Sequence, residues 1–180
     1  MGLSFNYDDF KSVFDSSMLK EAYEDDLDLT DCYMEMYKLI IHYFPECSKQ
    51  SELGGDEDTP IYLCPRPLKD GLGWTQIDTE TKALHQVLIS TKVISLDDVH
   101  YDSVVAHEAA HVAAYNYILN QDETVQTDLF NEWKETKGHT KKWHEIVDKL
   151  NSIKRKSTGM PAFDIVEVMD DENLKNYFNV

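Results

Sequence analysis

Residues 104–114 read VVAHEAAHVAA, and this stretch decides most of what the sequence predicts about the fold. A helix formed by these residues would be apolar on nearly all of its faces, and mostly apolar residues continue over about 102–119. We therefore expect one long, buried helix. At about 3.6 residues per turn, His107 and His111 share one face of such a helix, and Glu108 points to an adjacent side. Burying two imidazoles and a carboxylate without partners is costly. These three side chains are therefore expected to have a ligand or close partners.

Two histidines four residues apart, with a glutamate after the first, form the His-Glu-x-x-His arrangement of metal sites. Both rings can bind one ion, and Glu108 can take a proton from a water bound to that ion. Small residues such as Ala109 and Ala110 leave room for a second element to pack closely. The alternative interpretation is a pair of buried histidines hydrogen-bonded to neighbouring carbonyl groups or acids. The pattern favours a Zn²⁺ site in which Glu108 is the catalytic base.

A catalytic zinc ion needs a third protein ligand and keeps its fourth position for water. A metzincin would place a glycine and a third histidine where this chain has Ala114 and Tyr117, so that class is excluded. Glu132, in the next predicted helix, has the position of a thermolysin-like ligand. His139 is the leading candidate, because the start of a helix holds a ligand firmly in place. The residues leave both possibilities open.

Hydrophobic periodicity predicts an α+β fold around this helix, with N-terminal helices, a short sheet that contains a hairpin, and C-terminal helices. Helices are expected at 33–44, capped by Thr30 or Asp31 and ended by Pro45, more weakly at 10–23, and at 123–137 and 140–154. Strands are expected at 61–64, 73–78 and 83–90, of which the last two form the hairpin. Residues 48–60 are expected to be a loop, 95–98 the cap of a short helix, and 162–169 a strand or an irregular strap. Gly138 has the position of a helix C-terminal glycine.

The composition suits one soluble domain over residues 1–180, with its core at about 30–151 and a C-terminal tail at 152–180 that packs on it. The formal charge of −17 repels phosphate backbones and membrane surfaces, so neither nucleic acid nor a membrane is an expected direct partner.

The sequence has neither a signal peptide pattern nor a membrane-spanning apolar run, and a cytoplasmic location is expected. Three cysteines without Cys-x-x-Cys spacing exclude a cysteine zinc ribbon. Nothing in the sequence indicates an oligomeric state.

The order of these motifs resembles the SprT-like, or Spartan-type, zinc metalloproteases. The likeness covers about residues 30–151 and depends on 107–111, HEAAH, and on 139–143, HTKKW, in which an aromatic residue follows the last histidine by four positions. It implies a zincin-like metalloprotease fold and hydrolysis of peptide bonds in protein or peptide substrates. It further implies that His107, His111 and His139 hold Zn²⁺ and that Glu108 is the base. Thr140 replaces a glycine that is frequent in the family, and the family's zinc ribbon and DNA-binding segments are missing.

Two further expectations complete the sequence-based hypothesis. In zincins an extended substrate commonly pairs with an edge strand ahead of the active helix, and 83–90 is the candidate strand. Tyr115, Tyr117 and His85 are candidates for stabilising the oxyanion.

The alternative function is that of a non-catalytic acidic protein, with or without a structural zinc, which binds basic or DNA-binding proteins by resembling nucleic acid. The charge of −17 motivates that alternative.

Overall fold

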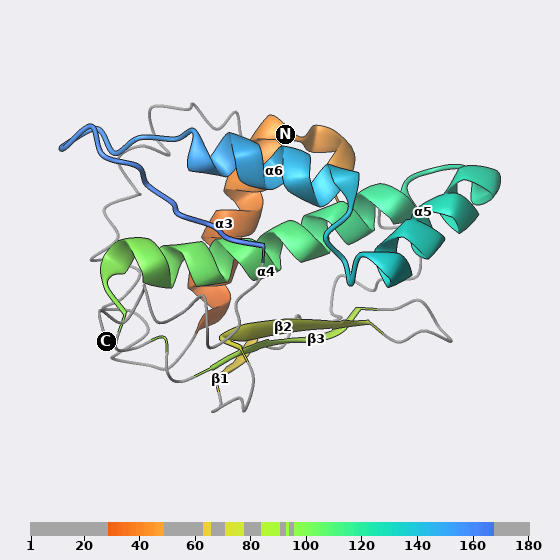
Figure 1. The fold of residues 1–180 in the computed structure, drawn as a ribbon, viewed down its shortest axis with the longest axis horizontal. Helices are drawn as coiled ribbons and strands as arrows, with labels where there is room; N and C mark the ends of the chain where they lie inside the picture. Colours follow the sequence, from red (N-terminus) through yellow and green to blue (C-terminus); the bar gives the residue numbers. More distant parts are fainter. Residues whose placement is uncertain are drawn as a thin grey trace.

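Helix α4 (Asp98–Leu119) is the central element of the computed structural model, which describes residues 29–48, 63–65, 71–77, 84–90, 93 and 96–167. It lies between the sheet on one side and helix α6 on the other, and helix α3 crosses behind it (Figure 1). Every residue from 101 to 116 is buried, which explains why the helix is apolar all round. The predicted long helix is confirmed. The prediction that 95–98 cap a separate short helix is wrong, because Asp97 caps α4 itself by accepting a hydrogen bond from the backbone N–H of His100.

The described sheet has three strands, β1 (Leu63–Pro65), β2 (Gly73–Ile77) and β3 (Leu84–Ile89), in the order β1-β3-β2. The predicted hairpin is confirmed, since β2 and β3 pair antiparallel from Gly73 opposite Ile89 onward, and its turn lies outside the described residues. Strand β1 pairs parallel to β3. The prediction that 83–90 forms the edge strand is wrong, because β3 is the central strand. In the part of the sheet that the structure describes, β2 is the edge strand on the hairpin side.

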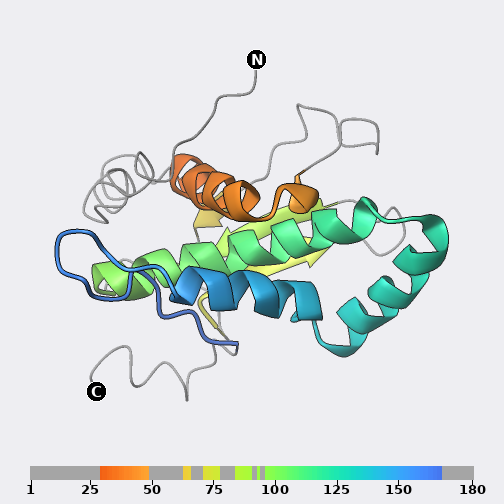
Figure 2. The ribbon, with the colours of Figure 1, turned by 90° about the horizontal axis from the view of Figure 1, so that it is seen from above.

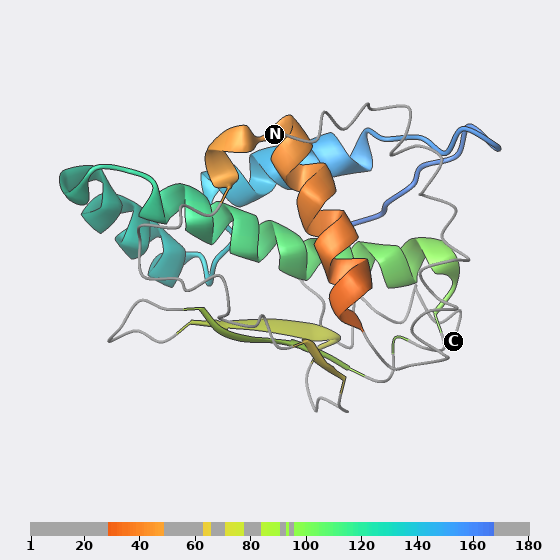
Figure 3. The same cartoon turned by 180° about the vertical axis from the view of Figure 1, so that it is seen from behind.

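Three further helices surround α4. Helix α3 (Leu29–Tyr43) crosses one flank of α4 and reaches the level of the sheet, where it contacts β1 (Figure 3). Helix α6 (Lys141–Asn151) lies alongside α4 (Figure 2). Helix α5 (Glu123–Glu135) follows the C-terminal end of α4 and projects beyond it (Figure 1). Pro45 ends α3 as predicted and begins the short 3-10 helix η1 (Pro45–Cys47). Thr30 and Asp31 lie in the first turn of α3 instead of preceding it.

The chain after α6 returns across the molecule as an irregular segment. An isolated bridge between Lys154 and Pro161 is its only regular pairing within the described residues, so the strap predicted at 162–169 is confirmed as far as residue 167. Ala162, Phe163 and Ile165 are buried in the core together with residues of α3, α4 and α6. We call residues 162–167 the C-terminal strap.

The described residues confirm the α+β class, with helices packed on a short sheet. The predicted helix at 10–23 and nearly all of the predicted loop at 48–60 lie outside the described residues. None of the helices in the described ranges is both long enough and apolar enough to cross a membrane.

Candidate metal centre

Three histidine side chains converge on one point between α4 and the start of α6. One ring nitrogen from each of His107, His111 and His139 lies within 4.8 Å of the other two. The Nε2 atoms of His107 and His111 are 3.1 Å apart, and the His139 ring centroid is 5.4 Å from that of His107 and 4.8 Å from that of His111. This separation suits three ligands of a single ion. Within the described residues this is the only group of its kind.

A tight turn between α5 and α6 directs His139 toward the pair on α4. Gly138 has a φ of +88°, and a Cβ atom at this position would come within 2.8 Å of His111 Nδ1. Only glycine combines the left-handed conformation with so close an approach. Thr140 then caps α6 by accepting a hydrogen bond from the backbone N–H of Trp143. His139 is therefore held between a glycine turn and a capped helix.

The C-terminal strap determines which nitrogen of His107 faces the centre. Nδ1 of His107 lies 3.0 Å from the carbonyl oxygen of Val166. Because a carbonyl group only accepts, Nδ1 carries the proton and Nε2 presents its lone pair to His111. Second-shell hydrogen bonds of this kind orient histidine ligands in metal sites.

The buried nitrogens also test whether a metal ion fits the site. Nε2 of His139 is buried and has no hydrogen-bond partner. The lone pair of His107 faces another imidazole nitrogen at 3.1 Å. A cation between the three rings would satisfy both atoms, and three imidazoles form a donor set suited to zinc, copper, iron or nickel. The residues present therefore fit a bound transition metal.

Burial keeps all three imidazoles neutral, which is the form that binds metals. It lowers the pKa of His107 to about 3; the proximity of His139 adds to this shift, and the hydrogen bond to Val166 opposes it. Burial also lowers the pKa of His111 well below its ordinary value, with further lowering by the two neighbouring imidazoles. The pKa of His139 is lowered as well, mainly by burial.

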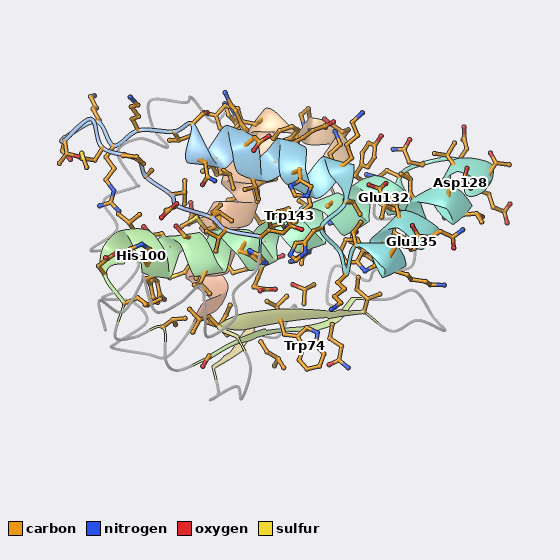
Figure 4. The ribbon with its side chains drawn as sticks, in the orientation of Figure 1. Trp74, His100, Asp128, Glu132, Glu135 and Trp143 are labelled. Carbon is orange, nitrogen blue, oxygen red and sulfur yellow. The ribbon has the colours of Figure 1, made fainter. Side chains whose placement is uncertain are left out.

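Two tryptophans form the apolar surroundings of the three rings. Trp143, which points from α6 toward α4 (Figure 4), has its ring centroid 5.0 Å from His107, 5.5 Å from His111 and 4.5 Å from His139. Trp133 of α5 lies edge-on to His111 at 5.8 Å. Trp143 is almost completely buried. Trp143 is therefore a packing residue whose contacts extend to all three histidines.

Glu108 follows His107 in α4, and its carboxylate lies against the edge strand. Its Oε2 accepts a hydrogen bond of 2.5 Å from Oγ1 of Thr75 in β2. A Cβ atom at Gly73 would collide with the same carboxylate, so any larger residue at this strand position would have to displace the Glu108 side chain. Burial raises the pKa of Glu108 to about 8, although the hydrogen bond from Thr75 acts in the opposite direction. A cation in the centre would favour the ionised carboxylate.

Sequence reasoning missed the residues that support the centre from a distance. Gly73 and Thr75 belong to a strand that was predicted correctly, but nothing in its pattern indicates that Glu108 would pack against it. Val166 contributes only a backbone oxygen, which the sequence cannot reveal. Asn151 holds the strap through two hydrogen bonds to the backbone of Ile165. In the sequence, Asn151 falls inside the helix predicted at 140–154, so no local pattern indicates this role.

The structure places the competing ligand candidate away from the histidines. Glu132 accepts a hydrogen bond of 2.6 Å from the backbone N–H of Lys141, so its carboxylate lies at the N-terminus of α6 (Figure 4). The side chain of His85 lies outside the described residues. The ring of Tyr117 lies under the Lys142 ammonium group, and that of Tyr115 packs on Trp133.

Comparisons with protein-family models, with curated proteins and with solved structures find no match to this chain. The chemistry of the site therefore has to be inferred from its own geometry. Three neutral imidazoles, a neighbouring buried carboxylate and an adjacent strand edge are the components available.

Proposed function

We propose that this chain is a zinc-dependent metallopeptidase of the zincin, SprT-like type that hydrolyses peptide bonds in protein substrates. The observation that carries the proposal is the meeting of three imidazoles whose nitrogens lie within 4.8 Å of one another, with Glu108 buried in the adjacent position. A structural pair of histidines would need only hydrogen-bond partners, whereas Nε2 of His139 is buried without one. A bound ion accounts for that atom.

His107, His111 and His139 would hold the ion and leave a fourth position open. When bound, Zn²⁺ supplies a Lewis acid that polarises the scissile carbonyl group and lowers the pKa of its water ligand toward 7. The choice of zinc follows from the resemblance of the motif and from the imidazole donor set.

Glu108 would handle the proton. Its carboxylate accepts a proton from the attacking water and then passes it to the leaving amine nitrogen, so that one group is base first and acid afterwards. Thr75 occupies Oε2 of this carboxylate and leaves Oε1 for the water. Thr75 is thus a positioning residue, and the tight packing at Gly73 keeps the carboxylate from turning away.

The substrate would bind along β2, the described edge strand next to the centre. Residues 74–77 all line a groove of about 700 Å³ between this strand and α5. Successive side chains of a strand point to opposite faces, so a groove lined by four consecutive residues runs along the backbone edge. An extended peptide can add to such an edge through main-chain hydrogen bonds. The scissile bond would then pass Thr75 and Glu108.

Metal analysis together with proteolysis tests the proposal. Purified protein should contain one equivalent of zinc and cleave casein in a chelator-sensitive manner. Glu108→Gln should retain the zinc and lose at least about 100-fold of the activity, since general acid–base catalysis contributes that much. His111→Ala and His139→Ala should lose both zinc and activity, and Glu132→Ala is the matched control that keeps both.

Three results would contradict the proposal. Undiminished cleavage by Glu108→Gln would reject the role of the carboxylate. Loss of zinc in Glu132→Ala but not in His139→Ala would indicate a thermolysin-like centre. Absence of metal, combined with salt-sensitive binding to a DNA-binding protein, would favour the acidic binding protein that the charge of −17 also suggests.

A further inference from the structure

The groove beside the candidate centre has an aromatic floor. The ring of Tyr115 lies 5.8 Å from that of Phe130 and 5.3 Å from that of Trp133, and Trp133 in turn contacts His111. All three aromatic residues line the groove. The floor therefore begins next to the metal centre and extends along α5. A recess of this kind is suited to a large apolar side chain.

The strand side of the groove adds an exposed tryptophan. Trp74 is 60% exposed and projects from the sheet on the side away from α4 (Figure 4). Among the described residues, the other large apolar side chains that are exposed are Val125 and Met160. Trp74 lines the groove whereas those two do not. Because its ring projects away from α4, Trp74 belongs to the outer face of the edge strand and does not extend the recess that Tyr115 of α4 helps to form.

The charged residues that line the groove are both lysines. Lys134 and Lys137 are exposed, and no carboxylate within the described ranges forms an ion pair with either. Such a pair is unusual in a chain with a formal charge of −17. Lys137 also has a φ of +53°, a conformation that non-glycine residues rarely adopt. The turn that positions His139 therefore also places a positive charge at the rim of the groove.

From these features we propose that the groove selects substrate segments in which a large apolar side chain is flanked by acidic residues. This proposal rests on the proposed peptidase function and adds the class of substrate. The apolar side chain would occupy the recess formed by Tyr115, Phe130 and Trp133. Carboxylates on either side of it would meet the Lys134 and Lys137 ammonium groups. Lys134 and Lys137 are the charged side chains of the groove lining itself, and the carboxylates of α5 lie outside that lining.

Binding of matched peptides to an inactive variant tests the selection directly. The probes are fluorescein-labelled decapeptides with a central Phe flanked by Glu, Gln or Lys, and a fourth with Ala in place of Phe. Affinity is measured by anisotropy on zinc-loaded Glu108→Gln protein at about 0.15 M salt. The Glu-flanked peptide should bind most tightly, and replacing its Phe by Ala should weaken binding at least about tenfold.

Charge variants separate the lysines from the general field of the protein. In the Glu108→Gln background, Lys134→Gln and Lys137→Gln should each weaken the Glu-flanked peptide about twofold to fivefold. Charge reversal of both, Lys134→Glu with Lys137→Glu, should make the Lys-flanked peptide the tighter ligand. Lys154→Gln with Lys156→Gln removes the same charge from the loop after α6, at the opposite end of the molecule from α5 (Figure 1), and should leave the order unchanged.

Casein cleavage by the wild-type chain distinguishes the two proposals. Equal binding of the Glu- and Lys-flanked peptides, or an equal loss of affinity in the Lys154→Gln, Lys156→Gln control, would overturn the proposed substrate selection. If the wild-type chain still cleaves casein in that case, the peptidase proposal stands. Conversely, ordered and lysine-dependent binding without any cleavage would support the groove as a peptide site and reject the peptidase.

Discussion

Replacing Asn151 by Ala should weaken metal binding even though this residue is not a proposed ligand. Asn151 donates from Nδ2 to the Ile165 carbonyl oxygen at 3.0 Å and accepts from the Ile165 N–H at 2.9 Å. The next residue along the C-terminal strap, Val166, accepts the hydrogen bond from His107 Nδ1. Asn151→Ala releases the strap at the position adjacent to that carbonyl group.

The magnitude follows from the hydrogen bonds that are lost. Each contributes about 0.5–1.5 kcal/mol, so the metal-free variant should be less stable by about 1–3 kcal/mol. Loss of second-shell support typically weakens metal binding by about 10–100-fold, which corresponds to about 1.4–2.7 kcal/mol. Asn151→Asp keeps the acceptor for the Ile165 N–H and loses the donor. We expect an intermediate effect for this variant.

Competition with a chromophoric chelator measures the zinc affinity, and urea unfolding in the presence of chelator measures the stability. Asn120→Ala is the matched control, because Asn120 also ends a helix and donates to two backbone carbonyl groups, those of Glu46 and Ser48. That variant should lose stability and keep its zinc affinity. If Asn151→Ala is destabilised but binds zinc within about twofold of the wild type, the strap does not orient His107 and the reasoning is refuted.

Three further outcomes are expected from single sites. Gly73→Ala forces the Glu108 carboxylate aside and should cost roughly 1–3 kcal/mol in urea unfolding, with a loss of casein cleavage; a fully stable and active variant would contradict the packing. Burial raises the pKa of Cys47 to about 12, so its thiol stays protonated and should resist iodoacetamide at pH 8 until the chain unfolds. Mass spectrometry of the labelled protein measures this, and rapid labelling of Cys47 in the folded protein would contradict it. Partial burial of Asp97 favours a higher pKa, but its hydrogen bonds with His100 lower the pKa on balance. The helix cap that Asp97 forms therefore stabilises the fold at pH values above the ordinary pKa of Asp, and this stabilisation is lost as the pH falls through the lowered pKa. Asp97→Ala should therefore cost about 0.5–2 kcal/mol at pH 7 and clearly less at pH 3, and equal losses at both values would exclude this mechanism.

Local sequence was sufficient wherever neighbours along the chain determine the geometry. The apolar run predicted α4, and the helical repeat alone placed His107 and His111 on one face. Gly138 indicated the turn that precedes α6. The beginning of α4 was misread because a capping sequence indicates where a helix begins and carries little information on how far it extends.

Long-range packing decided the rest. Only the folded chain brings His139 to the pair on α4 and directs Glu132 to the N-terminus of α6. The order of strands in the sheet, which makes β2 the edge, depends on pairings between distant segments and leaves no local pattern.

What the sequence by itself determined is a buried helix with two histidines and a carboxylate that need a partner. What the tertiary structure decided is the identity of their neighbours: the third ring from the turn before α6, the Thr75 hydroxyl from β2, and the Val166 carbonyl from the C-terminal strap. The physical reason is that helix periodicity is set by hydrogen bonds four residues apart. Contacts across a core depend on how whole elements pack, and a backbone carbonyl group looks the same at every position of the sequence.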